Sequence, residues 1–195
     1  MPVIRIGVKV IAAETIEYKI DKKDRINYID QAWIRFARLN DCGIKCKKEF
    51  VYGMHIFDCI CDPETRFLYQ TIIETVRNSG KSVKFPFRCD SPAERRFLEM
   101  EISPLNYGEI LFKSYTLKTE KRCKVNILAK NKEGSELITV CSMCKKIKTD
   151  KNTWSEVEDA LKKLELFLKT KLPQLTHGLC PSCYRRMMDE IDKIK

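Results

Sequence analysis

Cys141-Ser-Met-Cys144 and Cys180-Pro-Ser-Cys183 decide how the C-terminal part of this 195-residue chain folds. Each Cys-x-x-Cys pair presents two sulfurs from one tight turn, and the intervening chain brings the two turns together. This paired spacing is typical of a tetrahedral metal site, whereas a single Cys-x-x-Cys is a weak signal. We therefore predict that Cys141, Cys144, Cys180 and Cys183 bind one metal ion per chain.

The metal that suits these ligands best is zinc. An iron–sulfur cluster is disfavoured because three closely grouped cysteines are absent. Zinc would supply folding energy to a segment of about 50 residues that has little core of its own. Two disulfides, or two buried dithiols, are the alternatives. His177 is expected to support the turn before Gly178 by a hydrogen bond and not to ligate the metal.

The composition is that of a folded, soluble protein. Hydrophobic residues make up 44% and charged residues 33%, with seven glycines and seven prolines. The apolar stretches are too short for a membrane span, and the N-terminus lacks the pattern of a signal peptide, which predicts a cytoplasmic protein. Ten cysteines in such a chain are expected to be thiols or metal ligands.

The formal net charge of +10 raises the question of nucleic-acid binding. The charge is divided evenly between residues 1–122 and residues 123–195, with acidic residues mixed in throughout. A nucleic-acid footprint usually concentrates its charge on one face or in one module. The even spread therefore argues against nucleic acid as the partner.

The first two thirds of the chain read as two strands, helices and three further strands. Residues 16–28 alternate around a polar turn, which predicts a hairpin, and residues 31–40 predict a short helix with Trp33 and Phe36 facing inward. A longer helix is capped by Asp62, begins at Pro63 and ends at Asn78-Ser-Gly80. Residues 41–53 read as an irregular connection. Three strands follow over residues 83–87, 98–102 and 110–117.

The last third predicts a linker and two helices around the cysteine pairs. Residues 123–137 form the expected linker. Thr153-Trp-Ser-Glu156 is a candidate capping box, and an apolar stripe from Trp154 to Leu168 predicts one helix that Pro173 closes. A polar helix is expected from about Tyr184.

Residues 10–122 resemble a PAS domain. The resemblance rests on the order of elements, on Asn27-Tyr-Ile-Asp30 followed by Gln31-Ala-Trp33, and on Asp62-Pro-Glu64. It implies an α+β fold, with a five-stranded antiparallel sheet and helices on one face, that binds a ligand of unknown identity or a partner. The pocket would lie between the inner face of the sheet and the helices carrying Trp33 and Leu68. The candidate sheet residues, which simple core packing explains equally well, are Val83, Phe85, Phe87, Leu98, Met100 and Ile102.

The C-terminal part resembles a cysteine module found at the end of bacterial PAS-type sensor proteins. Residues 138–186 carry this resemblance through Cys141-Ser-Met-Cys-Lys-Lys146, Trp154-Ser-Glu-Val-Glu158 and Leu175-Thr-His-Gly-Leu-Cys-Pro-Ser-Cys-Tyr184. It implies a small metal-binding or redox-sensitive module attached to a sensory domain. Together with the cysteine spacing, it predicts a four-cysteine zinc-binding module over residues 138–195. Since the sequence contains no kinase or phosphoreceiver domain, the output would pass to a protein partner, and a second copy of the chain is a further candidate partner.

These observations predict a signal-sensing or interaction protein and not an enzyme. One alternative is a zinc-dependent nucleic-acid-binding regulator that uses the basic residues flanking the cysteine pairs, namely Lys145, Lys146, Lys148, Arg185 and Arg186. Another is a thiol redox sensor in which oxidation releases the metal. Four further cysteines are weaker candidates for a second metal or a thiol switch, namely Cys42, Cys46, Cys59 and Cys61. Cys89, Cys123 and His55 are given no role.

Overall fold

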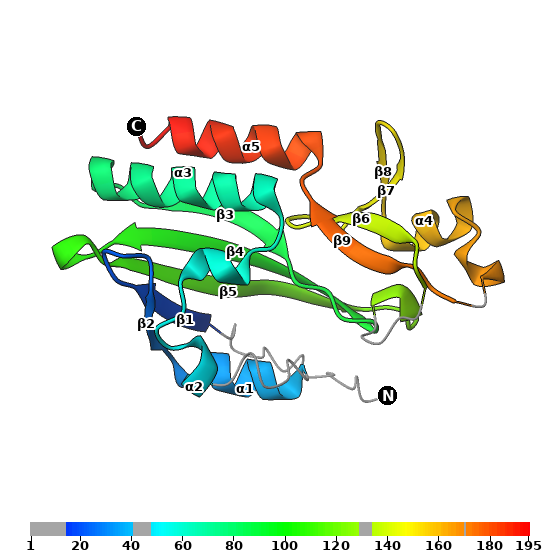
Figure 1. Ribbon diagram of the computed structural model, residues 1–195, viewed down its shortest axis with the longest axis horizontal. Coiled ribbons are helices and arrows are strands. Elements are labelled where there is room, and N and C mark those ends of the chain that lie inside the picture. Colours follow the sequence, from blue (N-terminus) through cyan, green and yellow to red (C-terminus); the bar gives the residue numbers. More distant parts are fainter. Residues whose placement is uncertain (1–14, 41–47, 129–133, 170) are drawn as a thin grey trace, which may run out of the picture.

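The protein has an α+β fold built around two sheets (Figure 1). The computed structural model describes residues 15–40, 48–128, 134–169 and 171–195. Among these residues, no helix combines the length and the apolar character that crossing a bilayer requires. The larger sheet contains β1 (Thr15–Ile20), β2 (Ile26–Ile29), β3 (Val83–Arg88), β4 (Glu94–Pro104) and β5 (Ile110–Lys121).

The larger sheet is antiparallel throughout, with the strand order β2-β1-β5-β4-β3. The register places Val83 opposite Ile102, and Ile102 opposite Phe112, so that apolar side chains share one face. The intervening residues form the other face, where Lys84 pairs with Glu101 at 3.4 Å. The predicted hairpin and the three predicted strands are confirmed, and one face of the sheet is left to be covered by helices.

The elements between the two groups of strands pack on the apolar face. They are α1 (Gln31–Leu39), α2 (Lys48–Val51), the 3-10 turn η2 (Ile56–Cys59) and α3 (Pro63–Ser79). The predicted ends of α3 are confirmed, because the Asp62 side chain accepts a hydrogen bond from the Thr65 N–H and Gly80 adopts a left-handed φ of 69°. The expected irregular connection over residues 41–53 contains the helix α2, whereas residues 41–47 lie outside the described residues.

The smaller sheet carries the cysteine pairs. Its strands are β6 (Leu137–Cys141), β7 (Ile147–Asp150), β8 (Thr153–Ser155) and β9 (Gln174–Gly178), in the order β8-β7-β6-β9. A separate core beneath it includes Val125 and Ile127, which come from the expected linker and from the 3-10 turn η4 (Asn126–Leu128). Residues 125–128, which belong to the expected linker, therefore contribute packing to this region.

The single helix predicted from Trp154 to Leu168 is wrong in extent. Trp154 lies on β8, where it pairs with Lys148, and α4 spans only Val157–Lys163 with Glu156 at its N-cap. Glu165 then adopts a left-handed φ of 49°, which ends the helix before the 3-10 turn η5 (Leu166–Leu168). Residues 153–155, which helical periodicity assigned to the first turn of the predicted helix, therefore form a strand that pairs with β7.

The last helix, α5 (Pro181–Asp192), begins earlier and is less polar than predicted. Met187 and Ile191 are fully buried, and α5 contacts both α3 and β3 (Figure 1). One continuous core therefore contains residues of the larger sheet, of α3 and of the cysteine region. The six sheet residues named as pocket candidates are mostly buried in packing, whereas the pocket between the sheet and the helices is lined by Tyr18 of β1, Trp33 of α1 and Tyr69 of α3.

Two leucines test the observed end of α4. Leu161 is 7% exposed, whereas Leu168 is 81% exposed. We expect Leu161→Ala to lower the free energy of unfolding by about 2–4 kcal/mol because it opens a cavity in the second core. Leu168→Ala should change it by less than about 0.5 kcal/mol. Equal losses in chemical denaturation would show that the longer amphipathic helix exists after all.

Candidate metal centre

The two cysteine pairs meet because they follow the ends of two neighbouring parallel strands. β6 and β9 run parallel, with Cys141 opposite Gly178. Cys180, two residues past Gly178, then lies next to the first pair, and its backbone N–H donates to Cys141 Sγ at 3.4 Å. The Ser142 N–H donates to the Gly178 carbonyl at 2.8 Å, which ties the two turns together.

The four sulfurs form one compact cluster. The Sγ atoms of Cys141, Cys144, Cys180 and Cys183 all lie within 4.8 Å of one another, and those of Cys144 and Cys180 are 3.7 Å apart. Tetrahedral zinc with bonds of about 2.3 Å requires sulfurs about 3.8 Å apart. All four cysteines are free thiols and not disulfides. The cluster can therefore hold one metal ion with four sulfur ligands.

The backbone shapes the first turn for this purpose. Lys145 adopts a left-handed φ of 62°, its N–H donates to the Cys141 carbonyl at 3.0 Å, and its Nζ donates to the Ser142 carbonyl at 2.7 Å. The Arg88 N–H, at the end of β3, donates to the Met143 carbonyl at 2.8 Å. The first turn is thus attached directly to the larger sheet.

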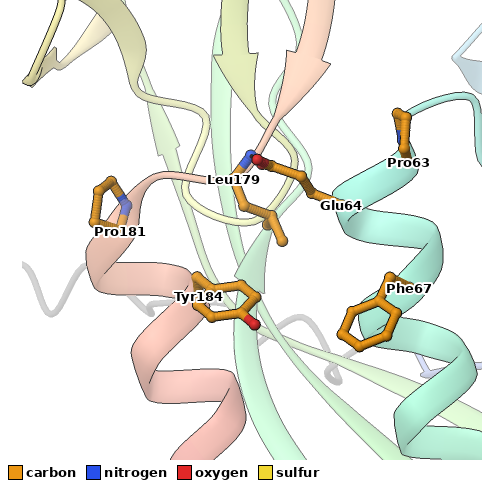
Figure 2. A pocket seen from close by; sticks show the side chains of 6 residues that line it. All are labelled: Pro63, Glu64, Phe67, Leu179, Pro181 and Tyr184. Atoms are coloured by element: carbon orange, nitrogen blue, oxygen red, sulfur yellow. Dashed lines mark hydrogen bonds between the residues drawn. The ribbon is translucent and has the colours of Figure 1, made fainter.

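The second turn is attached to α3. The Leu179 N–H donates to the Glu64 carboxylate at 3.2 Å, and Figure 2 shows Glu64 reaching across to Leu179. Phe67 and Tyr184 point into the groove between the first turns of α3 and α5. Cys180 is the N-cap of α5, so Cys183 lies in the first helical turn. Hydrogen bonds from α3 and from β3 therefore hold the two cysteine turns in place.

Hydrogen bonds among the four cysteines lower the pKa of one sulfur and raise the pKa values of two others. Hydrogen bonds from Cys144 and Cys183 hold the pKa of Cys141 far below its usual value. The hydrogen bond between Cys141 and Cys144 raises the pKa of Cys144 to about 12. Hydrogen bonds to Cys141 and Cys144 raise the pKa of Cys183 as well. One thiolate is therefore stabilised by its protonated neighbours. A bound divalent cation would replace those protons.

Two of the basic residues that flank the cysteine pairs donate hydrogen bonds within the cysteine region. Besides the bond from Lys145 Nζ, the Arg186 guanidinium donates to Cys183 Sγ at 3.6 Å. These basic groups lie beside the four-sulfur cluster and would partly offset the negative charge of metal-bound thiolates. Lys145 and Arg186 therefore make hydrogen bonds within the cysteine region itself. The nucleic-acid hypothesis had assigned these two side chains to contacts with phosphate groups.

The histidines lie outside the sulfur cluster. His177, on β9, faces a pocket of about 610 Å³ together with Ser142. Burial, aided by Lys145, lowers the pKa of His177, which favours the neutral imidazole. His55 packs its ring against Phe57 at 5.3 Å.

The remaining cysteines that the structure describes lie outside the four-sulfur cluster. Cys42 and Cys46 lie outside the described residues, so the structure does not test them. Cys59 and Cys61 are exposed and line the same pocket as His177. Partial desolvation of the Cys59 sulfur in the pocket wall, together with Asp58, raises the pKa of Cys59, which favours the thiol over the thiolate. Cys89 and Cys123 are free thiols outside the four-sulfur cluster.

A buried ion network beside the first turn escaped sequence reasoning. The Arg88 guanidinium contacts Asp90 at 2.5 Å and Glu156 at 2.8 Å, and Arg122 contacts Asp90 at 3.4 Å. The Asp90 side chain is only 1% exposed. In the sequence, Asp90 belongs to a polar stretch that reads as an ordinary surface loop, and nothing there shows that two arginines converge on it. The network joins β3 to the N-terminus of α4.

Comparison of the sequence with models of known protein families and with curated proteins found no match.

Asp90→Asn tests the ion network. The substitution leaves the buried guanidinium groups of Arg88 and Arg122 without their shared carboxylate, and we expect a loss of about 3–5 kcal/mol in unfolding free energy. Asp192→Asn is the matched control, because Asp192 pairs with Lys195 on the surface. That control should leave the denaturation midpoint unchanged. A wild-type midpoint for Asp90→Asn would contradict the stabilising role assigned to the network.

Proposed function

We propose that this protein is a signal-sensing or interaction protein, in which a PAS-like domain is stabilised by a structural zinc centre with four cysteine ligands. The observation that carries the proposal is the shared core. Cys141, Cys180 and Cys183 belong to the same apolar cluster as Ile72 of α3 and Phe85 of β3. A metal held there supports the region that would bind a signal, and a change at either place reaches the other through packed side chains.

Zinc suits the donor set best. Four cysteine sulfurs fill a tetrahedral coordination shell, so that no position remains for water or substrate. Closed sites of this kind have structural roles, whereas catalytic zinc sites keep an open position. We therefore assign the centre a role in folding.

The assignment of the larger domain to the PAS type is supported by the order of its elements. Two strands, a set of short helices with one longer helix, and three antiparallel strands follow one another as the sequence resemblance implies. Helices cover one face of the sheet, and the other face is polar. On this proposal the domain binds a ligand or a partner, and the output passes to another protein.

Metal content tests the proposal. Protein purified without added metal should contain about one zinc per chain, measured by elemental analysis. Cys141→Ser/Cys180→Ser should lose the zinc, together with the protease resistance of α5, because the metal supplies folding free energy. Cys59→Ser/Cys61→Ser is the matched control, since it removes two thiols outside the cluster. That variant should retain both properties.

Two results would contradict the structural zinc centre. One is protein without metal whose four cysteines titrate as free thiols or form two disulfides. The other is a double variant that lacks zinc but keeps wild-type protease resistance and thermal stability.

A further inference from the structure

A pocket of about 610 Å³ joins the sheet region to the metal centre. Tyr18 of β1, Trp33 of α1 and Tyr69 of α3 line it from one region, and Ser142 and His177 line it from the cysteine region. Ser142 lies between two metal ligands, and His177 lies on the strand that leads to the second pair. The volume is within the usual range for small-molecule sites.

Core packing fixes the aromatic walls of this pocket in place. The Tyr18 ring stacks on Phe112, with centroids 4.6 Å apart, and meets Trp33 edge-on at 5.2 Å. Tyr69 meets Phe85 edge-on at 6.3 Å. Since Phe112 and Phe85 are almost fully buried in the core, these rings are held before any ligand arrives. A preformed aromatic wall suits a flat ring system.

The charges in the pocket disfavour an anion. Among the described residues that line it, none is Lys or Arg, whereas Asp58 and Asp62 are acidic. Asp62 already accepts hydrogen bonds from the backbone and hydroxyl of Thr65. Burial raises the pKa of Tyr69 to about 12 and raises that of Tyr18, so both phenols are uncharged. An anionic ligand would lose its hydration without gaining a cation.

A residue that lines the pocket carries a buried donor without a partner among the described residues. Trp33 Nε1 is inaccessible to solvent and has no hydrogen-bond acceptor within the part of the chain that the structure describes. An unpaired buried donor is costly, and a ligand atom that accepts from it would recover that cost. A carbonyl oxygen or a ring nitrogen provides such an acceptor.

We propose that this pocket binds an uncharged, flat ring compound with a hydrogen-bond acceptor, and that the bound compound strengthens metal binding by the four cysteines. The second part rests on the proposed zinc centre, whereas the first does not.

The link between pocket and metal runs through the two residues from the cysteine region. Thr65 Oγ1 lies 3.0 Å from Ser142 Oγ, so the start of α3 already contacts the first cysteine turn at the pocket wall. A ligand held between the aromatic wall and Ser142 and His177 restrains both turns in the arrangement that brings the sulfurs together. By linkage, metal binding must increase the affinity for the ligand by the same factor.

Binding is tested with prodan, an uncharged fluorescent dimethylaminonaphthalene ketone. Prodan should bind saturably at one site per chain, with a blue shift of its emission, and the corresponding dimethylaminonaphthalene sulfonate should bind at least about tenfold more weakly. Trp33→Phe keeps a ring but removes the N–H, so it should weaken prodan binding about five- to tenfold. Trp154→Phe, the matched control at the other tryptophan, should leave the affinity unchanged.

The coupling is tested by measuring zinc affinity against a competing chelator, with and without saturating prodan. We expect prodan to raise the zinc affinity about fivefold or more, and the sulfonate at the same concentration to leave it unchanged. In Trp33→Phe the effect should require proportionally more prodan. Elemental analysis of the same samples measures the zinc content independently.

Each other result overturns a defined part of the account. Equal binding of prodan and the sulfonate, or binding that Trp33→Phe does not weaken, overturns the ligand class. Prodan binding with an unchanged zinc affinity overturns the coupling and leaves the proposed zinc centre intact. Protein without zinc that still binds prodan through Trp33 overturns the proposed zinc centre and leaves the pocket assignment.

Discussion

The parallel pairing of β6 with β9 is the constraint on which the rest of this structure depends. Each strand ends in a turn that contains two cysteines, so the pairing places all four sulfurs within 4.8 Å of one another. The same geometry sends the chain out of β9 toward α3, where Pro181 starts the last helix. Without this pairing, α5 would have no fixed direction, and the sulfurs would not meet.

The position of α5 makes the four-cysteine cluster part of the main core. Met187 and Ile191 bury one face of the helix against α3 and β3, while Cys183, one turn earlier, points to the sulfur cluster. Glu64 and Arg88 add hydrogen bonds from the larger domain to each cysteine turn. Metal binding and the packing of the sheet are therefore linked by direct contacts.

The sequence predicted the elements whose signals are local. Asp62 and Gly80 marked the ends of α3, and alternation located all five strands of the larger sheet. The spacing of the cysteines identified the four residues that cluster. The helix predicted from Trp154 failed because a three-residue strand, held by pairing with β7, overrode helical periodicity. The contact of Asp90 with Arg122, and the position of Ser142 and His177 at the aromatic pocket, depend on residues distant in the chain, so no local pattern reveals them.

Hydrogen exchange measured with and without a metal chelator tests the shared core most directly. If the metal centre stabilises the whole core, chelation should increase exchange in α3 and β3 as well as in β6, β9 and α5. Intact protection of α3 and β3, with increased exchange confined to residues 137–195, would contradict this account and show two independently stable regions.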